Sequence, residues 1–166
     1  LNVSSVELLD VSDGAREPVA MSAADDELLV VYFGYTSCPD ICPTTMSDIS
    51  IALNDLDPAD ASRVRVAMVS VDPERDEPAI LDAYLSSFFT DPLALHASDA
   101  DALAAAADAF GVRFEIEDHE PGALAYEVSH SAVTYVVDDT GTVAVEWPFG
   151  FDSEQMSADL AQLLES

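Results

Sequence analysis

The feature that constrains the fold most is the apolar run LLVVYFGY at residues 28–35. Its apolar residues do not alternate with polar ones, and several are β-branched or aromatic, which is typical of a strand buried on both faces. A second, largely apolar run follows at residues 64–71. Parallel neighbours in such a sheet must be joined by helical crossovers. The sequence therefore predicts an α/β fold built around a central sheet.

Turn and capping residues mark the remaining elements. Two short strands around the turn Ser12-Asp13-Gly14 predict an N-terminal β-hairpin. A helix start is expected at Ser98 or Asp99, and that helix should stop before Gly111. Another helix is expected to start at Asp152. Further strands are expected at residues 6–9, 19–21, 113–115, 132–137 and 142–147, and helices at residues 43–56, 77–89, 99–110 and from 152 onward. This order predicts a single thioredoxin-like domain over residues 1–166, with a central mixed sheet flanked by helices.

The charge balance excludes several classes of partner. The chain has 33 Asp and Glu residues against 5 Lys and Arg residues, which gives a formal net charge of −28. Nucleic acids and anionic lipids are bound through basic patches, so neither is expected as a partner. The acidic residues are spread along the chain, which predicts a uniformly acidic, solvated surface. A charge this large indicates a halophilic protein, because high salt screens the repulsion.

Membrane insertion is not expected from this chain. Its longest uninterrupted apolar stretch, at residues 28–35, is far shorter than the roughly 20 residues that a membrane-spanning helix needs. The sequence begins at Leu1 without an initiator methionine, which is compatible with a targeting or anchoring segment upstream.

Cys38 and Cys42 are the only cysteines, and they directly follow the first apolar strand. Metal binding, a reversible disulfide between them, or two idle thiols are the alternatives. Idle thiols are disfavoured, because the start of a helix stabilises a thiolate and the flanking prolines fix the loop. Since proline favours the first helical position, we expect the helix to begin at Pro43 with Cys42 as its N-cap. Soft thiolates one turn apart select copper(I) or zinc and leave coordination positions open.

Three histidines are candidates for such an open position. His130 precedes the strand expected at residues 132–137, and in a thioredoxin fold that loop faces the redox-active cysteines. It is therefore the predicted third ligand. His96 adjoins an apolar run and is predicted to be structural. His119 lies in an acidic loop and is predicted to be solvated.

The segment YFGYTSCPDICPTTM at residues 32–46 resembles the signature of the Sco/SenC copper chaperones. Weaker matches follow in the same order along the chain: SVDPERD at residues 70–76, AFGV at residues 109–112, His130-Ser131, and then Tyr135, Asp138 and Gly141. The resemblance implies one copper ion per chain, as copper(I) or copper(II), held by Cys38, Cys42 and His130.

The same resemblance implies a function and a location. Sco/SenC proteins help to assemble the dinuclear copper centre of cytochrome c oxidase, by delivering copper, by reducing the target's cysteines, or both. The implied partner is the copper-bearing subunit of the oxidase. The implied location is the extracytoplasmic side of the cell membrane, with an N-terminal anchor that this sequence does not contain. We expect the domain to be a monomer.

Asp72 and Ser129 are two polar positions expected near the site. Asp72 matches an acidic position of the family, where it would steer a partner or tune the metal, although a turn-capping aspartate is an equal alternative. Ser129 stands where the family often has aspartate before the ligand histidine. If that aspartate supports the imidazole, its absence would alter copper affinity or potential without removing a ligand.

A thiol-disulfide oxidoreductase is the main alternative function, with Cys38 and Cys42 as its catalytic residues and the oxidase subunit or another client as substrate. Such enzymes usually have two residues between the cysteines and a proline opposite them. Here three residues intervene and no proline lies between Pro121 and Pro148, which favours metal binding. A peroxiredoxin is disfavoured because Thr36 lies only two residues before the first cysteine. A copper or redox sensor without an oxidase client stays open.

Overall fold

The computed structural model describes residues 1–38, 41–123 and 128–165, apart from the side chains of Ile41 and Ser129. A seven-stranded sheet forms its centre, in the order β2-β1-β5-β4-β3-β8-β9. The strands are β1 (Glu7–Asp10), β2 (Glu17–Ala20), β3 (Leu28–Gly34), β4 (Val64–Ser70), β5 (Leu93–His96), β8 (Thr134–Val137) and β9 (Val143–Trp147). Strands β3, β4 and β5 are parallel, whereas β1, β2, β8 and β9 are joined by antiparallel pairing. The expected mixed sheet and N-terminal hairpin are therefore confirmed.

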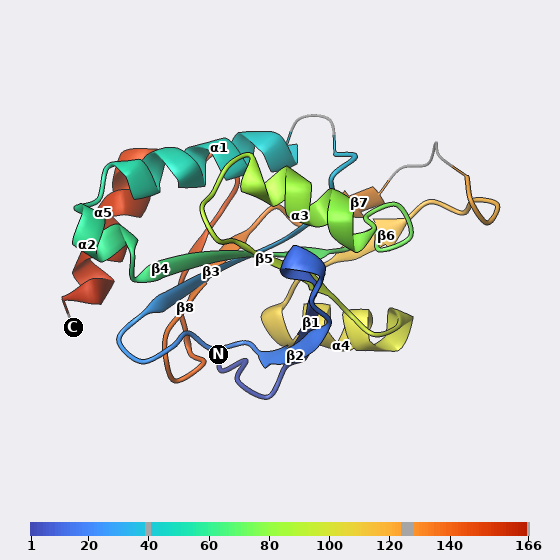
Figure 1. Cartoon of the computed structure of the whole chain (residues 1–166), viewed down its shortest axis with the longest axis horizontal. Coiled ribbons are helices and arrows are strands. Elements are labelled where there is room, and N and C mark those ends of the chain that lie inside the picture. The colour runs from blue at the N-terminus through green and yellow to red at the C-terminus, as the bar shows by residue number, and fades with distance from the viewer. Residues whose placement is uncertain (39–40, 124–127, 166) are drawn as a thin grey trace.

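Helices cover both faces of this sheet. They are η1 (Ser12–Gly14), α1 (Ile41–Asn54), α2 (Pro58–Ala61), α3 (Pro78–Ser86), α4 (Ala100–Phe110) and α5 (Ser153–Leu164). Helices α1 and α3 lie over one face and α4 lies under the other (Figure 1). All seven residues of β3 are buried between these layers, as its continuous apolar run predicts.

Two helix ends follow the expected capping chemistry. The carboxylate of Asp99 accepts a hydrogen bond of 2.7 Å from the backbone N–H of Ala102 at the start of α4. Gly111 ends that helix with a φ of 79°, a backbone conformation that glycine adopts without strain. Asp152 caps α5 in the same way through the N–H of Gln155. Local sequence therefore sets where these helices begin and end.

Helix α1 differs from the expectation at its start. It begins at Ile41, so Cys42 lies in its first turn and is not its N-cap. The prediction placed the first helical residue at Pro43 because a residue before proline is biased away from the helical region. A proline in the first turn costs no hydrogen bond, since the first-turn N–H groups have no intrahelical acceptor. The buried contacts of Cys42 outweigh the steric bias on this residue.

A second, two-stranded sheet was not expected as such. It joins β6 (Phe114–Ile116) to β7 (Val128–His130) in antiparallel pairing. His130 is the last residue of β7, and β8 begins only at Thr134. The pairing joins segments far apart in sequence, so no local pattern of residues indicates it.

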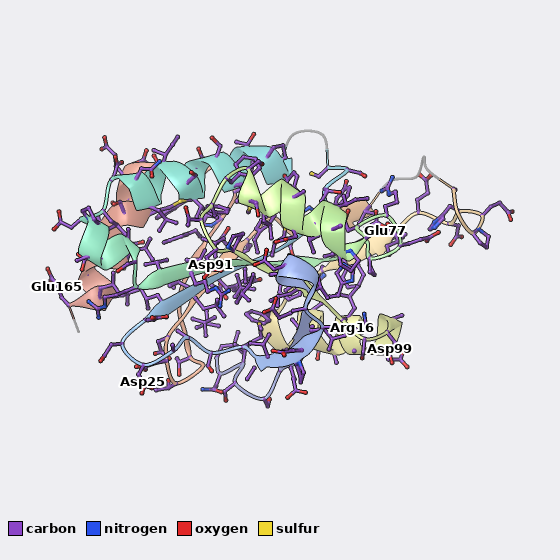
Figure 2. All side chains as sticks on the ribbon, in the orientation of Figure 1. Arg16, Asp25, Glu77, Asp91, Asp99 and Glu165 are labelled. Carbon is purple, nitrogen blue, oxygen red and sulfur yellow. The ribbon has the colours of Figure 1, made fainter. Side chains whose placement is uncertain are left out.

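The acidic side chains are distributed over the surface, as the sequence indicates. Figure 2 shows Asp25, Asp91, Asp99 and Glu165 on different sides of the molecule, and all four are exposed. Repulsion among such charges acts on the whole domain and not on a single segment.

We predict that the melting temperature rises as sodium chloride increases from about 0.01 M to about 1 M, because the screening length falls from ~30 Å to ~3 Å. Thermal unfolding followed by circular dichroism across this series measures the effect. A melting temperature that stays constant or falls would contradict the halophilic interpretation.

Candidate metal centre

Both cysteines lie where the chain leaves the carboxyl end of β3 and enters α1. Their thiols are free, and Cys38 and Cys42 are 8 % and 0 % exposed. The backbone N–H of Cys42 donates a hydrogen bond of 3.4 Å to the Sγ of Cys38. The backbone N–H of Cys38 donates in turn to the carbonyl oxygen of Tyr35, at 3.3 Å. The turn between strand and helix therefore brings the two sulfurs together.

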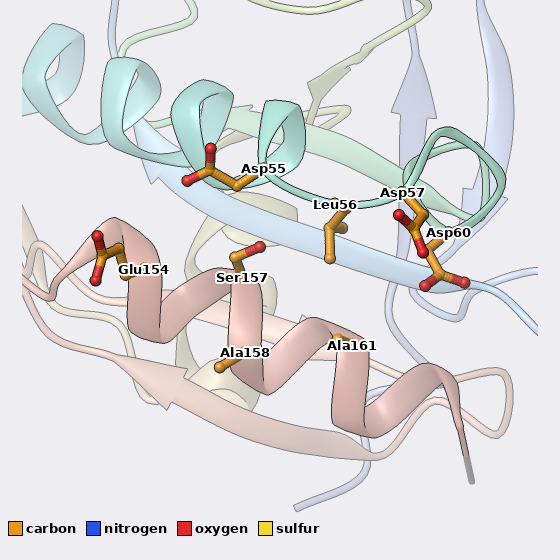
Figure 3. A pocket seen from close by; sticks show the side chains of 8 residues that line it. All are labelled: Asp55, Leu56, Asp57, Asp60, Glu154, Ser157, Ala158 and Ala161. Atoms are coloured by element: carbon orange, nitrogen blue, oxygen red, sulfur yellow. The ribbon is translucent and has the colours of Figure 1, made fainter.

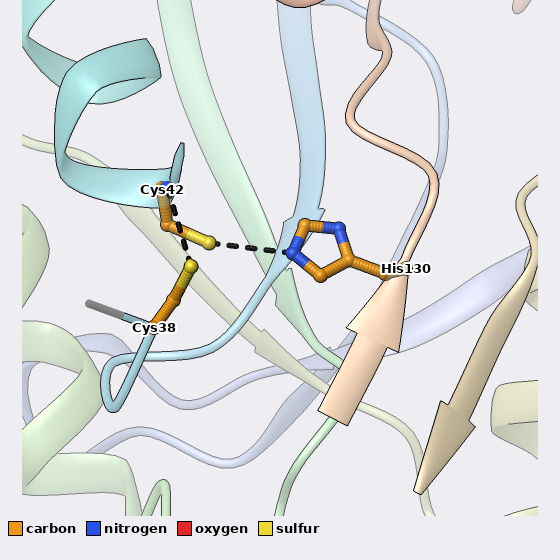
Figure 4. A group of neighbouring side chains, drawn as sticks. All are labelled: Cys38, Cys42 and His130. Atoms are coloured by element: carbon orange, nitrogen blue, oxygen red, sulfur yellow. Dashed lines mark hydrogen bonds between the residues drawn. The ribbon is translucent and has the colours of Figure 1, made fainter. Parts of the chain in front are cut away.

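His130 approaches this pair from β7 (Figure 4). Its Nε2 lies 3.5 Å from the Sγ of Cys42, and its Nδ1 lies 3.1 Å from the carbonyl oxygen of Ser131. A carbonyl oxygen only accepts hydrogen bonds, so Nδ1 carries the proton and the lone pair of Nε2 faces the sulfur. The imidazole of His130 is thus oriented as a ligand.

The three side chains form a compact set of soft donors. The Sγ atoms of Cys38 and Cys42 and a ring nitrogen of His130 all lie within 4.8 Å of one another. It is the one group of three or more such donors in the part of the chain that the structure describes. Thiolate and imidazole donors suit copper or zinc, whereas calcium and magnesium require oxygen ligands. The residues present therefore fit a copper ion.

Gly34 leaves room for this arrangement. A Cβ at this position would lie 3.1 Å from the Sγ of Cys42 and 2.7 Å from a ring carbon of Tyr32. The hydroxyl of Tyr32 donates to the same sulfur at 3.8 Å, and burial raises the pKa of this tyrosine, so that it stays protonated. A side chain at residue 34 would thus displace either the sulfur or its hydrogen-bond donor.

Burial controls the protonation of the site. Burial, and then the hydrogen bond with Cys38, raises the pKa of Cys42 to about 12. Burial also lowers the pKa of His130, against the opposing effect of its bond to Ser131. At neutral pH Cys42 is therefore a thiol and His130 a neutral imidazole, so a metal ion must displace a proton from Cys42 but none from Nε2. Burial thus opposes the stabilisation that the start of a helix gives to a thiolate.

The other two histidines lie outside this cluster. His96 is buried in β5, and its Nε2 bonds to the carbonyl oxygen of Asp76 at 2.6 Å, which fits the predicted structural role. His119 is half-buried, whereas the sequence predicts a solvated side chain. Its Nδ1 contacts the carbonyl oxygen of Glu117 at 2.8 Å and its Nε2 contacts the carboxylate of Glu74 at 2.7 Å, and these two acceptors raise its pKa.

Asp72 contributes no donor atom to the cluster. Its carboxylate is 1 % exposed and forms an ion pair of 2.5 Å with the Nε of Arg75. Its backbone N–H donates to the hydroxyl of Ser70. The carboxylate is therefore engaged inside the protein, and a role in steering a partner stays a prediction. The side chain of Ser129 lies outside the described residues, so the effect of this position also stays a prediction.

Asp76 supports the site, although in the sequence it is marked only as the last residue of the SVDPERD motif. Its buried carboxylate accepts hydrogen bonds from the backbone N–H and the hydroxyl of Thr36 and from the hydroxyl of Ser70. Burial raises the pKa of Asp76, and these donors oppose the rise. The network ties the segment before Cys38 to the end of β4.

A recess at the other end of α1 has a different character (Figure 3). Acidic side chains and a few small or apolar ones line this recess: Asp55, Leu56, Asp57, Asp60, Glu154, Ser157, Ala158 and Ala161. Its carboxylates do not converge as the cysteines and His130 do. The recess therefore offers no comparable site for a metal ion.

Comparison with known proteins agrees with this geometry. The sequence model of the SCO1/SenC family matches residues 9–165. A SCO2-like protein of Rickettsia prowazekii is 32% identical over 114 residues, which cover 69% of this chain and 55% of the relative. The chain spans about half the length of the first curated relatives it matches.

Solved structures share the fold. ScoI of Bradyrhizobium japonicum with copper bound superposes with a TM-score of 0.78 at 31% identity, over 95% of this chain and 96% of that one. BsSco gives a TM-score of 0.68 at 21% identity, over 99% of this chain and 95% of that one. It is described as a member of the Sco family of cytochrome c oxidase assembly proteins that has a disulfide switch. The latter likeness shows the fold alone. The expected thioredoxin-like architecture is confirmed.

We predict that Asp72→Asn lowers the free energy of unfolding by about 3 kcal/mol, because it removes the charge of a carboxylate that is 1 % exposed and ion-paired with Arg75. Denaturant titration measures the loss. Asp91→Asn is the matched control, since the Arg65–Asp91 pair is exposed and its loss costs under about 1 kcal/mol. Equally small losses in both variants would contradict the importance of the buried pair.

Proposed function

Because the chain belongs to the SCO1/SenC family, we propose that it is a copper chaperone that binds one copper ion through Cys38, Cys42 and His130. The observation that carries this proposal is the convergence of two sulfurs and one imidazole nitrogen within 4.8 Å. The copper bound to B. japonicum ScoI, a relative with 31% identity, supports the choice of metal.

The donor set suits an ion that is carried and then released. Structural zinc sites are almost always closed by four ligands, whereas three donors converge here among the residues that the structure describes. Two soft thiolates favour copper(I), and the imidazole of His130 also suits copper(II). An incomplete set of ligands leaves a position at which a donor atom from another protein enters. Copper transfer then proceeds by exchange of one ligand for another.

The client and the location belong to the same proposal. We propose that the copper-bearing subunit of cytochrome c oxidase receives the ion, and that the domain acts as a monomer on the extracytoplasmic side of the cell membrane. Membership of the SCO1/SenC family supports both statements. Among the described residues, no helix has the length and apolar character needed to cross a bilayer.

A thiol-disulfide reaction of the same cysteines is the second candidate function. The two thiols are free and in contact through the N–H of Cys42 and the Sγ of Cys38, so they are placed to form a disulfide. Oxidation would join the two sulfurs, release two electrons and two protons to a disulfide of the client, and remove both thiolates from copper. Reduction of a client and copper binding are thus mutually exclusive states of one site.

We predict that the reduced protein binds one copper ion per chain, and that oxidation to the disulfide abolishes binding. His130→Ala should lose the copper(II)-thiolate absorption yet still form the disulfide, because only the metal site needs the imidazole. Cys38→Ser and Cys42→Ser should lose both the copper(II)-thiolate absorption and the ability to form the disulfide. Anaerobic copper titration with metal analysis, together with mass measurement after mild oxidation, tests these outcomes.

The matched control is His119→Ala, which removes a half-buried histidine outside the cluster. It should keep the stoichiometry and the copper(II) spectrum of the unaltered protein. A His130→Ala variant with the full copper(II) spectrum would exclude His130 as a ligand. An unaltered protein without copper affinity but with rapid disulfide reduction would favour the oxidoreductase instead.

A further inference from the structure

We propose that Tyr35 is the residue that positions His130 against the two cysteines, with Arg75 and Asp72 holding the tyrosine ring from behind. This positioning role builds on the copper site proposed above. It assigns a task to three side chains that supply no donor atom to the ion.

His130 needs such a support because of where it lies in the fold. In the described part of the chain, β7 pairs with β6 and not with the central sheet that leads to the cysteines. The bond from Nδ1 to the carbonyl oxygen of Ser131 orients the imidazole relative to its own backbone only. The distance from Nε2 to the sulfurs must therefore be set by contacts between the two sheets.

Two tyrosines make these contacts. The ring of Tyr32 meets the imidazole of His130 edge to face with centroids 5.8 Å apart, but Tyr35, which is 7 % exposed, also bonds to β7 itself. Its hydroxyl donates a hydrogen bond of 2.9 Å to the carbonyl oxygen of Val128, at the start of β7. Its ring meets the imidazole of His130 edge to face, with centroids 5.7 Å apart. Its backbone carbonyl accepts the N–H of Cys38. One residue thus holds the segment of one sulfur ligand through its backbone and the strand of the nitrogen ligand through its side chain.

The outer face of the tyrosine is covered by Arg75. The guanidinium carbon lies 5.9 Å from the centroid of the Tyr35 ring, within the range of a cation–π contact. Asp72 fixes the guanidinium through the ion pair at Nε, and the arginine side chain is only 12 % exposed. The buried carboxylate therefore acts on the site through Arg75 and Tyr35. This gives Asp72 a physical role different from the expected ones of steering a partner or capping a turn.

Removal of the tyrosine hydroxyl should loosen β7 and leave the ligands in place. The carbonyl of Val128 would lose its donor, while the ring of Tyr35 and its backbone bond to Cys38 would stay. Partners that orient metal ligands typically change affinity by roughly 10- to 100-fold when they are lost. The N–H of Cys38 should keep its acceptor, because the backbone of residue 35 is unchanged, and the thiol of Cys38 would lose only its side-chain interaction with the phenol.

Tyr35→Phe tests the proposal. Its copper(II) complex should show a dissociation constant raised by roughly 10- to 100-fold and a weakened nitrogen hyperfine coupling in electron paramagnetic resonance. The midpoint potential of the Cys38–Cys42 disulfide should shift by much less than the copper affinity, because the phenol has only a side-chain interaction with the thiol of Cys38. Tyr135→Phe is the matched control, since Tyr135 is buried and packs against Phe110, a residue of α4 on the other face of the sheet.

Affinity and hyperfine coupling that stay within twofold of the unaltered protein would overturn the positioning role. So would a loss of affinity that Tyr135→Phe reproduces, because the effect would then be general loosening. A shift of the disulfide potential equal to the change in copper affinity would also overturn it, since the variant would then act on the cysteines.

Hydrogen exchange of the metal-free protein separates this inference from the proposed function. Tyr35→Phe should accelerate exchange of the amides at residues 128–131 and leave those of β3 unchanged. If the unaltered protein binds no copper, the proposed function fails, while faster exchange at these amides still supports the contact between Tyr35 and β7. Unchanged exchange would overturn the contact whatever the copper result.

Discussion

The burial of β3 is the constraint on which the rest of the site depends. All seven of its residues are buried, and it pairs with β4 in parallel and with β8 in antiparallel register. Its register cannot slip by one residue without reversing which side chains face each helical layer. The end of β3 therefore delivers Tyr35 and Cys38 to one fixed place, and the parallel strand β4 ends at the same edge of the sheet. The segments that follow these two strands build the site.

Two buried carboxylates hold these segments, and each has a different task. Asp76 binds the backbone and hydroxyl of Thr36, which fixes the approach to Cys38. Asp72 holds Arg75 against the ring of Tyr35. Burying a carboxylate is costly unless it is paired or hydrogen-bonded, and both are. These contacts arrange the ligand side chains before the metal binds. Binding of the metal then requires little further ordering of the protein.

The sequence could predict the residues that carry chemistry better than those that position them. The run at residues 28–35 indicates β3 because its pattern is local, and Asp99 and Gly111 mark the ends of α4 for the same reason. The cysteine spacing and the family resemblance single out the ligand set. The bond from Tyr35 to Val128 joins residues 93 positions apart, so no local pattern reveals it. The pairing of β6 with β7 could not be predicted for the same reason. The start of α1 was predicted wrongly from Pro43, because the bias of a residue before proline is weaker than the tertiary context.

The most direct test of the copper centre is X-ray absorption at the copper edge of the loaded, reduced protein. Two sulfur scatterers and at least one imidazole nitrogen per copper ion are expected, since the Sγ atoms of Cys38 and Cys42 and a ring nitrogen of His130 converge within 4.8 Å. Cys42→Ser should lower the sulfur count by one, and His130→Ala should remove the imidazole signal. A first coordination shell of oxygen atoms, without sulfur, would contradict the account.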